Sequence, residues 1–363
     1  EHSVDSQGYL CGDFHIHTNR SPDSRDSARY KLASAAADGL EIAVRSEHEY
    51  VAEFAPLVQE MGIDRWVYGL TSLELTTFVW GHFGVFPLQV NPMQPNGGAV
   101  NWAGRLPPAV FAEVRARPEA PAIVVNHPRT AGLGFGYVTV AGYNPATGMA
   151  ERPEYWDDRL STFEFFNDST FEQNPENVRD WYSFLGRGRR VFAVGSSDSH
   201  TVSAGSPVGY PRTCLYLGTD TPAMATPNGI RDAVASGRST VSGGVYLDVA
   251  ASPGAGGMAT AGPGQELMGA GAEARIRLRV QAAPWVTATR AEVIVDGMAR
   301  QTITLDNTTR DPMNPVIRLQ RDVMVPVAAG GSWVIVAVHG GELVPVFPRR
   351  NAFGVSNPIF LRR

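Results

Sequence analysis

The sequence predicts an α/β protein whose first 243 residues form a mostly parallel sheet or barrel, followed by a small all-β sandwich. Up to Gly243, short apolar runs alternate with helical patterns, as in repeated strand–helix units. After Gly244 the helical patterns stop, and alternating strands separated by turns take their place. We therefore expect two domains, residues 1–243 and residues 244–363.

The predicted elements of the first domain follow one another in a regular order. The apolar run "YLCGDFHIH" (9–17) is typical of a strand, and residues 28–39 have a helical pattern that ends at Gly39, a favoured residue after a helix C-terminus. Further strands are predicted at 40–48, 65–75, 82–88, 121–127, 161–167 and 190–198, and helices at 107–117, 174–186 and 226–236. This order predicts βα units.

The second domain has the signals of antiparallel strands. In residues 274–282, Ile276, Leu278 and Val280 alternate with three arginines, as in a strand with one buried face. Asp296–Gly297 is a strong signal for a hairpin turn between two strands. We expect an immunoglobulin-like sandwich here.

Composition and charge exclude several classes of protein. The formal net charge of −5 argues against bulk attraction to nucleic acid or to an anionic membrane. The partner that we expect is a small-molecule substrate. No apolar stretch reaches the length of about 18 residues that a membrane-spanning helix needs. The two cysteines, Cys11 and Cys214, exclude a disulfide scaffold and leave their own pairing open, and the oligomeric state is not readable.

The start of the chain bears on its cellular location. It begins at Glu1 without an initiator methionine or a signal-peptide pattern. We interpret this as a processed or trimmed product whose address segment has been removed, as in a bacterial protein that is secreted or periplasmic.

Six of the eight histidines stand at or next to predicted strands. They are His15, His17, His48, His82, His127 and His200, whereas His2 and His339 lie outside this pattern and are expected to play no part. Five of the six stand at the C-terminal end of a strand, where parallel α/β folds collect catalytic groups. Glu74, Asp198 and Asp23 accompany them. Because buried imidazoles and carboxylates need partners, a shared metal cluster is the interpretation we favour.

The first strand shows why these residues suit a metal. Alternation puts Asp13, His15 and His17 on one face, and two histidines at i and i+2 can bind a single ion. In the same way, Asp198 and His200 can serve neighbouring ions.

These motifs resemble the PHP (polymerase and histidinol phosphatase) superfamily. The resemblance lies in "HIHT" (15–18), "SEH" (46–48), "LEL" (73–75) with the following histidine, "NHPR" (126–129) and "SSDSH" (196–200). Longer stretches resemble its CehA/McbA, carbaryl-hydrolase-like branch, namely "GDFHIHTNRSPDS" (12–24), "FEFFND" (163–168), "ASGRSTVSGG" (235–244) and "FGVSNPIFL" (353–361). The resemblance implies a distorted (β/α)7 barrel with a centre of two or three Zn, Mn or Fe ions.

By this resemblance the ligands divide into three groups. His15, His17, Glu74 and Asp198 would hold one ion; Glu74 would bridge to a second ion held by His82 and His127; Asp23, His48 and His200 would hold a third. Glu47 stands where the family more often has aspartate, which leaves open whether it touches a metal or orients a ligand, the role we favour. Asp13 and Glu164 are expected to orient the metal ligands without binding a metal ion themselves. Arg129 either steadies an anionic oxygen or braces the fold.

The predicted function is that of a metal-dependent hydrolase, with Arg129 and Glu47 as candidate catalytic residues. Closely spaced ions generate a metal-bound hydroxide near neutral pH, so no serine or cysteine nucleophile is needed. We expect cleavage of a phosphoester, as in PHP domains generally. One alternative is a carbamate, amide or ester hydrolase with the same metals, and another is a non-catalytic, metal-stabilised barrel with a binding β-domain.

Overall fold

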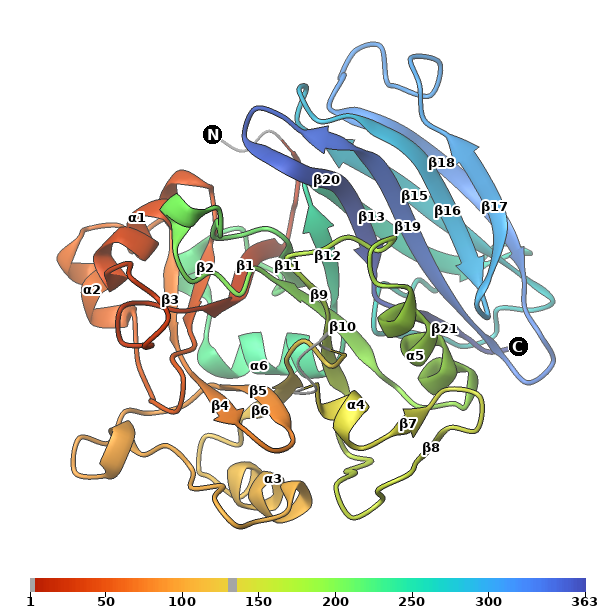
Figure 1. Ribbon diagram of the computed structural model, residues 1–363. Helices are drawn as coiled ribbons and strands as arrows, with labels where there is room; N and C mark the ends of the chain where they lie inside the picture. Colours follow the sequence, from red (N-terminus) through yellow and green to blue (C-terminus); the bar gives the residue numbers. More distant parts are fainter. Residues whose placement is uncertain (1–3, 130–135) are drawn as a thin grey trace. The chain divides into compact units, whose positions relative to one another are not determined.

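The computed structural model describes residues 4–129 and 136–363 (Figure 1). The chain divides into two compact units. We call the first the histidine unit; it contains Gly8–Asp168 and Asn174–Ala235. The second, the β-unit, contains the residues up to Gln7 together with Ser169–Gln173 and Ser236–Arg363.

Two open sheets form the centre of the histidine unit. One has the strand order β11–β1–β2–β3 and the other β10–β9–β6–β5–β4. The bounds are Tyr9–Ile16 (β1), Ile42–Arg45 (β2), Tyr68–Thr71 (β3), Leu73–Thr77 (β4), Gly81–Phe86 (β5), Ala122–Val125 (β6), Thr162–Asn167 (β9), Phe192–Ser196 (β10) and Arg212–Tyr216 (β11). A short hairpin adds β7 (Tyr143–Asn144) and β8 (Met149–Ala150).

The described residues of this unit form six helices. They are α1 (Ala28–Ala37), α2 (Ala55–Glu60), α3 (Pro107–Arg115), α4 (Tyr137–Val140), α5 (Pro175–Gly186) and α6 (Pro227–Ala235), with 3-10 turns at Pro95–Gly97, Val202–Ala204 and Pro222–Met224. Within the described ranges, none of the helices combines the length and the apolar character that crossing a membrane requires.

The predicted α/β class with a (β/α)7 barrel is wrong. The structure is mostly β, with 38% strand and 17% helix, and residues 4–129 and 136–363 contain no closed barrel. The reason is that β3, β4 and β5 follow one another without a helix, so β4 and β5 pair antiparallel, with Thr77 opposite Gly81. The strand β11 also pairs antiparallel with β1. Parallel pairing of consecutive strands requires a long crossover connection, and the short turn between β4 and β5 does not provide one.

Two apolar cores pack against the two faces of the sheet β11–β1–β2–β3. Leu32 of α1 and Val58 of α2 pack with Ala43 of β2 in one core, in keeping with the position of both helices beside β2 and β3 in Figure 1. The other core combines β1 and β2 with α6 and with strands of the second sheet. The first sheet is therefore buried on both faces.

A register shift in β1 changes the simple alternation that its sequence predicts. The pairing of β1 with β2 shifts between Asp13 and Ile16. As a result Phe14 lies in the core with α6, whereas Ile16 lies in the core with α1. Beyond this shift, isolated bridges join Ile16 to Ser199 and His48 to Glu74, and so bring the ends of the two sheets together.

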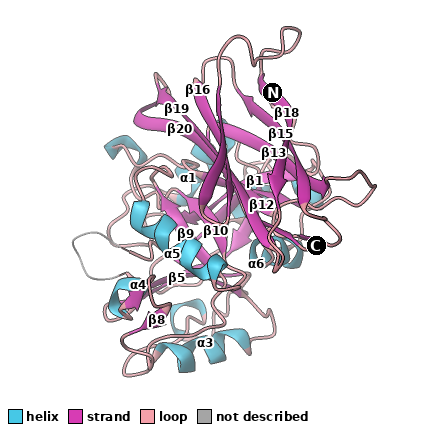
Figure 2. Cartoon of the chain, turned by 90° about the vertical axis from the view of Figure 1, so that its right-hand side faces the viewer, coloured by secondary structure: helices cyan, strands magenta, loops and turns pink. Residues whose placement is uncertain are grey.

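The β-unit consists of strands and loops (Figure 2). Its strands are β12 (Ser239–Gly243), β13 (Val245–Pro253), β14 (Glu266–Leu267), β15 (Glu273–Ala282), β16 (Ala288–Val295), β17 (Met298–Thr304), β18 (Ile317–Pro326), β19 (Ser332–Leu343), β20 (Phe347–Ser356) and β21 (Ile359–Leu361). The strands β13, β15 and β18 form one sheet, and the others belong to a second. The alternation in β15 is as predicted, with Ile276, Leu278 and Val280 buried. Asp296–Gly297 forms the turn between β16 and β17.

A disulfide joins Cys11 of β1 to Cys214 of β11, two residues directly opposite in the antiparallel register. We expect the double variant Cys11→Ser/Cys214→Ser to lose about 2–4 kcal/mol of unfolding free energy, because the cross-link restricts the unfolded chain. Urea denaturation followed by circular dichroism measures this loss. The unmutated protein with its disulfide reduced should unfold at the same urea concentration as the variant. Equal midpoints for the oxidised protein and the variant would contradict the prediction.

Candidate metal centre

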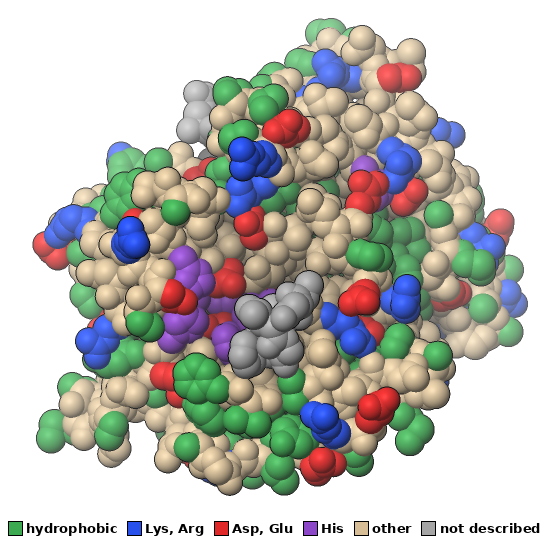
Figure 3. Space-filling model, in the orientation of Figure 1, with side chains coloured by type: hydrophobic (Ala, Val, Ile, Leu, Met, Phe, Trp, Pro, Cys, Tyr) green, Lys and Arg blue, Asp and Glu red, His purple; other side chains and the backbone are tan. Residues whose placement is uncertain are grey.

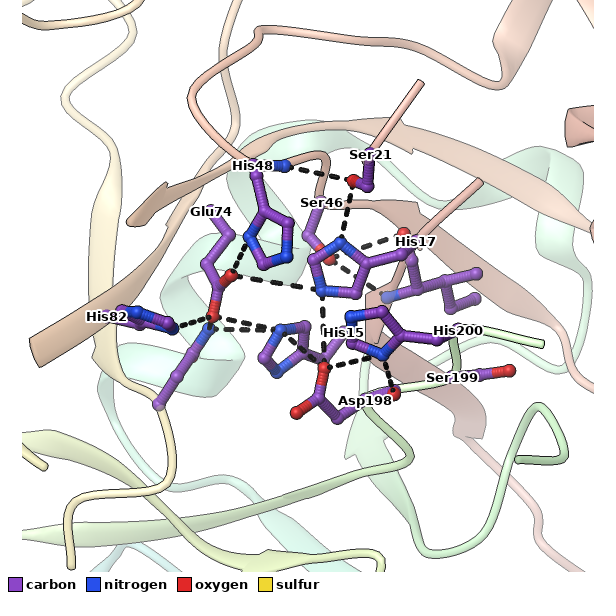
Figure 4. A network of polar contacts seen from close by, with 12 residues as sticks. His15, His17, Ser21, Ser46, His48, Glu74, His82, Asp198, Ser199 and His200 are labelled. Atoms are coloured by element: carbon purple, nitrogen blue, oxygen red, sulfur yellow. Dashed lines mark hydrogen bonds and ion pairs between the residues drawn. The ribbon is translucent and has the colours of Figure 1, made fainter. Parts of the chain in front are cut away.

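The first group of ligand atoms lies near the ends of β1 and β10 and near the start of β4, and Figure 4 shows these side chains directed toward one another. The Nε2 atom of His15 lies 3.1 Å from Oε1 of Glu74 and 3.2 Å from Oδ1 of Asp198. The Nε2 atom of His17 also lies 3.2 Å from that Oδ1 atom. Both imidazoles are fully buried, and the Glu74 side chain is 1% exposed. These four side chains therefore present donor atoms to one another in the interior.

Glu74 belongs to a second group as well. Its Oε1 atom lies 3.3 Å from Nδ1 of His82 on β5 and 3.5 Å from Nε2 of His127, which follows β6. The antiparallel hairpin β4–β5 brings His82 back beside Glu74, with Thr76 opposite His82 in the register. Glu74 is thus the common member of both groups.

A third group lies on the more exposed side of the cluster. Asp23 places Oδ2 3.1 Å from Nε2 of His48 and 3.2 Å from Nε2 of His200. The imidazole of His17 stacks on that of His200 with 4.2 Å between ring centroids. The structure therefore brings all nine predicted ligands into one continuous cluster. Figure 3 shows histidine and acidic side chains of this face at the surface, with hydrophobic side chains nearby.

The spacing of these atoms fits a metal ion. Ligands at about 2.0–2.2 Å from one ion lie roughly 3–3.5 Å from each other, which is the spacing found here. Three sets of side chains could each hold an ion: His15 with His17 and Asp198, Glu74 with His82 and His127, and His17 with His48 and His200. Within the described residues, Nε2 of His17 and Oδ1 of Asp198 are buried and contact each other as an ion pair without a hydrogen bond. Two such atoms directed at each other are what a shared cation would satisfy.

Groups behind the histidines set which ring nitrogen is available. The Nδ1 atom of His15 lies 2.9 Å from Oε1 of Glu164, and that of His17 lies 2.9 Å from Oγ of Ser21. The Nδ1 atom of His200 contacts the carbonyl oxygen of Asp198 at 2.8 Å. With a proton on Nδ1, each of these imidazoles keeps its lone pair on Nε2, the atom directed into the cluster.

The contact between Glu164 and His15 leads to a testable prediction. Besides His15, Glu164 accepts hydrogen bonds through Oε2 from the backbone N–H of His127 and from Asn167. The substitution Glu164→Gln would direct an amide N–H toward one of these donors, so we expect metal affinity to fall by about 10- to 100-fold. Titration with Zn²⁺ against a competing chelator measures the affinity. Unchanged affinity in a folded variant would show that His15 needs no such support.

The charges within the cluster offset the cost of burial. Burial raises the pKa of Glu74, but His15 and His82 outweigh it and hold that pKa well below its usual range. Burial lowers the pKa of His15, but Asp198 and Glu164 raise it well above the ordinary value. At His17 burial dominates and lowers the pKa to about 4. A metal ion must therefore displace a proton from His15, and binding should release protons.

Two ligands have a backbone conformation that favours glycine. His127 has a φ of 27° and Asp198 a φ of 50°. Such conformations cost of order 1–3 kcal/mol for non-glycine residues and cluster at functional sites, where the surrounding structure holds them in place. Ala120 and Arg349 have the same conformation, so at His127 and Asp198 it orients the side chains and does not by itself assign them a function.

Glu47 and Asp13 lie against backbone and hydroxyl donors. The Glu47 carboxylate accepts hydrogen bonds from the backbone and hydroxyl groups of both Thr18 and Ser21, and from Nε of Arg45. Asp13 accepts from the backbone N–H groups of His15, Ser197 and Gly209. These contacts hold the loops that carry the ligands, and they occupy both carboxylates.

Arg129 is held by an ion pair with Asp180. Its guanidinium donates to both carboxylate oxygens of Asp180 on α5 and to the carbonyl oxygen of Tyr143. Of the two roles considered for Arg129, these contacts correspond to bracing the fold.

Sequence reasoning missed a buried lysine behind the centre. Lys31 on α1 is fully buried, and its Nζ atom donates to the carbonyl oxygen and to Oγ of Ser199, at 3.0 and 2.6 Å. Ser199 stands between Asp198 and His200, so Lys31 holds the loop that carries both. Since Lys31 is the only lysine among 31 basic residues, its rarity was a signal that could have been used.

Two side-chain amides donate hydrogen bonds to carboxylates of the cluster. Asn126 donates to Oε1 of Glu74 at 3.0 Å, and Asn167 donates to Oδ2 of Asp198 at 3.2 Å. His339 lies in the β-unit between Glu172 and Glu292. His2 lies outside the described residues.

No protein-family model matches the chain, and no curated protein is significantly similar to it. The geometry of the cluster is therefore the main basis for a proposed function.

Proposed function

We propose that this protein is a hydrolase that depends on two or three divalent metal ions of the Zn, Mn or Fe type. The observation that carries the proposal is the convergence of Nε2 of His15 and His17 on Oδ1 of Asp198, beside the carboxylate of Glu74. The resemblance of the ligand motifs to PHP proteins supports the same proposal.

Bound ions of this type would acidify a water molecule and polarise the bond to be cleaved. The chain's own hydroxyl groups near the centre are used for other contacts. Ser197 donates to Asp13, Ser199 donates to the carbonyl oxygen of Ser206, and Ser21 donates to Glu47. This favours attack by water over attack by a serine.

One cation supports a phosphoester as the substrate. The exposed guanidinium of Arg20 lies 3.8 Å over the ring of Tyr50, and in the described ranges it has no carboxylate partner. Arg20 lies three residues after His17 and three before Asp23 along the chain, and Tyr50 lies two residues after His48. We propose that the Arg20 guanidinium steadies an anionic oxygen at the open side of the centre. A carbamate, amide or ester would not need this cation, and it is the alternative substrate class for the same centre.

The first test is elemental analysis of the purified protein beside three variants. We expect two or three equivalents of metal per chain, fewer in His15→Ala and Asp198→Ala, and an unchanged content in His339→Ala, whose imidazole lies in the β-unit. If added Zn²⁺ or Mn²⁺ fails to load the unmutated protein, the proposal is wrong.

The second test compares substrates on the metal-loaded protein. Turnover of p-nitrophenyl phosphate, lost in Asp198→Ala, would support the phosphoester proposal. Cleavage of an aryl carbamate without any phosphatase activity would replace it with the alternative substrate class. If neither is cleaved although metal is bound, a non-catalytic, metal-stabilised unit with a binding β-unit becomes the better explanation.

The disulfide bears on the location of the protein. Stable disulfides form in oxidising compartments, so the Cys11–Cys214 bond supports the proposal of a secreted or periplasmic protein.

A further inference from the structure

Three loops of the β-unit lie at the same end of its strands. They are residues 283–287 between β15 and β16, 305–316 between β17 and β18, and 344–346 between β19 and β20. Ala288 at the start of β16 pairs with Gly340 near the end of β19, and Arg290 pairs with the last residue of β17. Figure 1 shows this end at the top of the β-unit. We call these three segments the tip loops.

The tip loops expose apolar side chains. Trp285 is 48% exposed, and Met313 is 90% exposed. Val344 and Val346 are each about half exposed. Neighbouring strands of a sheet lie about 4.8 Å apart, so β17, β16, β19 and β20 together span roughly 15 Å. Single exposed apolar side chains are common, but several at one end of a unit are typical of an interaction surface.

A buried arginine fixes the loop that carries Trp285. Arg318 of β18 is only 4% exposed. Its Nη2 atom donates to the carbonyl oxygen of Ala283 at 2.7 Å and to that of Val286 at 3.0 Å. These two residues stand on either side of Trp285 in the chain, so the exposure of the tryptophan is a property of a fixed loop.

The positive charge of Arg318 is not balanced by an acid. Burial, and after it the guanidinium of Arg310 in the tip loops, lowers the pKa of Arg318. Among the residues that the structure describes, no carboxylate forms an ion pair with either arginine, and both Nε atoms are buried without a hydrogen-bond partner. Two like charges held together in this way are unfavourable, and an anion would offset the cost. The guanidinium group is well suited to phosphate oxygens.

The acids of the tip loops close turns within their own loop. Asp306 accepts hydrogen bonds from the backbone N–H and the hydroxyl of Thr308, and Asp311 accepts from two backbone N–H groups that follow it. Near the start of β20, the exposed Arg349 adds a third positive charge at this end of the unit. This end therefore combines exposed apolar side chains with arginines that lack acidic partners.

We propose that the tip loops bind the surface of a membrane that contains anionic phospholipid. A lipid phosphate contacts Arg310, with Arg318 behind it, and Trp285, Val344 and Val346 lie among the lipid headgroups. Tryptophan favours this region because its ring is apolar and its N–H is polar. Apolar contact and local positive charge together determine such binding. The net charge of −5 gives the whole chain no general attraction, so binding depends on this end alone. The proposal is independent of the metal centre.

Sedimentation with lipid vesicles tests this proposal on the full chain. We expect binding to vesicles of phosphatidylcholine mixed with phosphatidylglycerol, and binding weaker by about fivefold or more to phosphatidylcholine alone, because each arginine near an anionic surface contributes on that scale. Trp285→Ala and Arg310→Gln should each weaken binding to the mixed vesicles by about fivefold. Met298→Ala and Arg300→Gln are matched controls, because both residues are exposed near the β16–β17 turn, at the opposite end of these strands.

The melting temperature distinguishes lost binding from lost folding. Because Arg310→Gln removes one of two like charges, we expect it to keep or raise the melting temperature while it weakens vesicle binding. A lowered melting temperature would show that Arg310 serves the fold, and would overturn its role as a phosphate contact.

The other outcomes separate a membrane from a free anion. Absence of binding, equal binding to both kinds of vesicle, or binding that survives Trp285→Ala and Arg310→Gln would overturn the proposal. So would calorimetry in which inorganic phosphate binds at Arg310 while the mixed vesicles do not sediment the protein, since the site would then serve a free phosphate.

Discussion

Replacing Glu74 with glutamine should reduce bound metal from two or three ions per chain to at most one, and should abolish hydrolysis. The carboxylate of Glu74 contacts imidazoles of the first and second groups through Oε1 and one of the third group, His48, through Oε2. An amide offers one oxygen and places N–H donors where a cation would lie. Because Glu74 joins the groups, its loss should affect more than one ion. Elemental analysis and turnover of p-nitrophenyl phosphate measure both effects.

A matched control comes from another buried glutamate. Glu41 is 6% exposed and accepts a hydrogen bond from the backbone N–H of Cys11, away from the metal ligands. Glu41→Gln should keep its full metal content. If Glu74→Gln also kept it, the role of Glu74 as the shared ligand would be refuted.

Removing the metal should have the second large effect. We expect chelation to lower turnover by at least about a thousandfold and to lower the melting temperature, because the ions stabilise the state that binds them. Without an ion, Asp198 and Glu74 remain buried against histidines that must take up protons. Adding Zn²⁺ or Mn²⁺ back should restore both turnover and melting temperature. Calorimetry measures the melting temperature, and turnover of p-nitrophenyl phosphate measures the activity.

A comparison of two variants distinguishes the effect of losing metal from a general loss of stability. Asp198→Ala should have a low melting temperature that changes less with chelator or added metal than that of the unmutated protein, whereas His339→Ala should respond as the unmutated protein does. Turnover that persists after complete removal of metal, checked by elemental analysis, would exclude a metal-dependent reaction.

Much of the candidate centre was visible in the sequence because its residue types are informative by themselves. Histidines rarely follow strand after strand by chance, and His15–X–His17 and Asp198–X–His200 have spacings that two ligands can use. The residues that support them were harder to find. Ser21 and Lys31 have no distinctive spacing, and only the contacts of the folded chain show that they support His17 and the loop of Ser199.

The arrangement of the strands could not be predicted in the same way. Apolar runs show where strands lie, but a run such as 65–75 does not show that it divides into β3 and β4. Nor does it show that β4 turns back to pair antiparallel with β5, because pairing depends on contacts between distant segments. The barrel prediction failed at this step.

The sequence by itself determined which side chains are available to bind metal, since that depends on residue type and on their positions next to apolar runs. The tertiary structure alone decided which of their atoms meet. The shift in β1, the bridge from His48 to Glu74 and the left-handed conformation of Asp198 orient the donors toward one another. Such orientation results from the packing of two sheets around shared cores, and no local stretch of sequence encodes it.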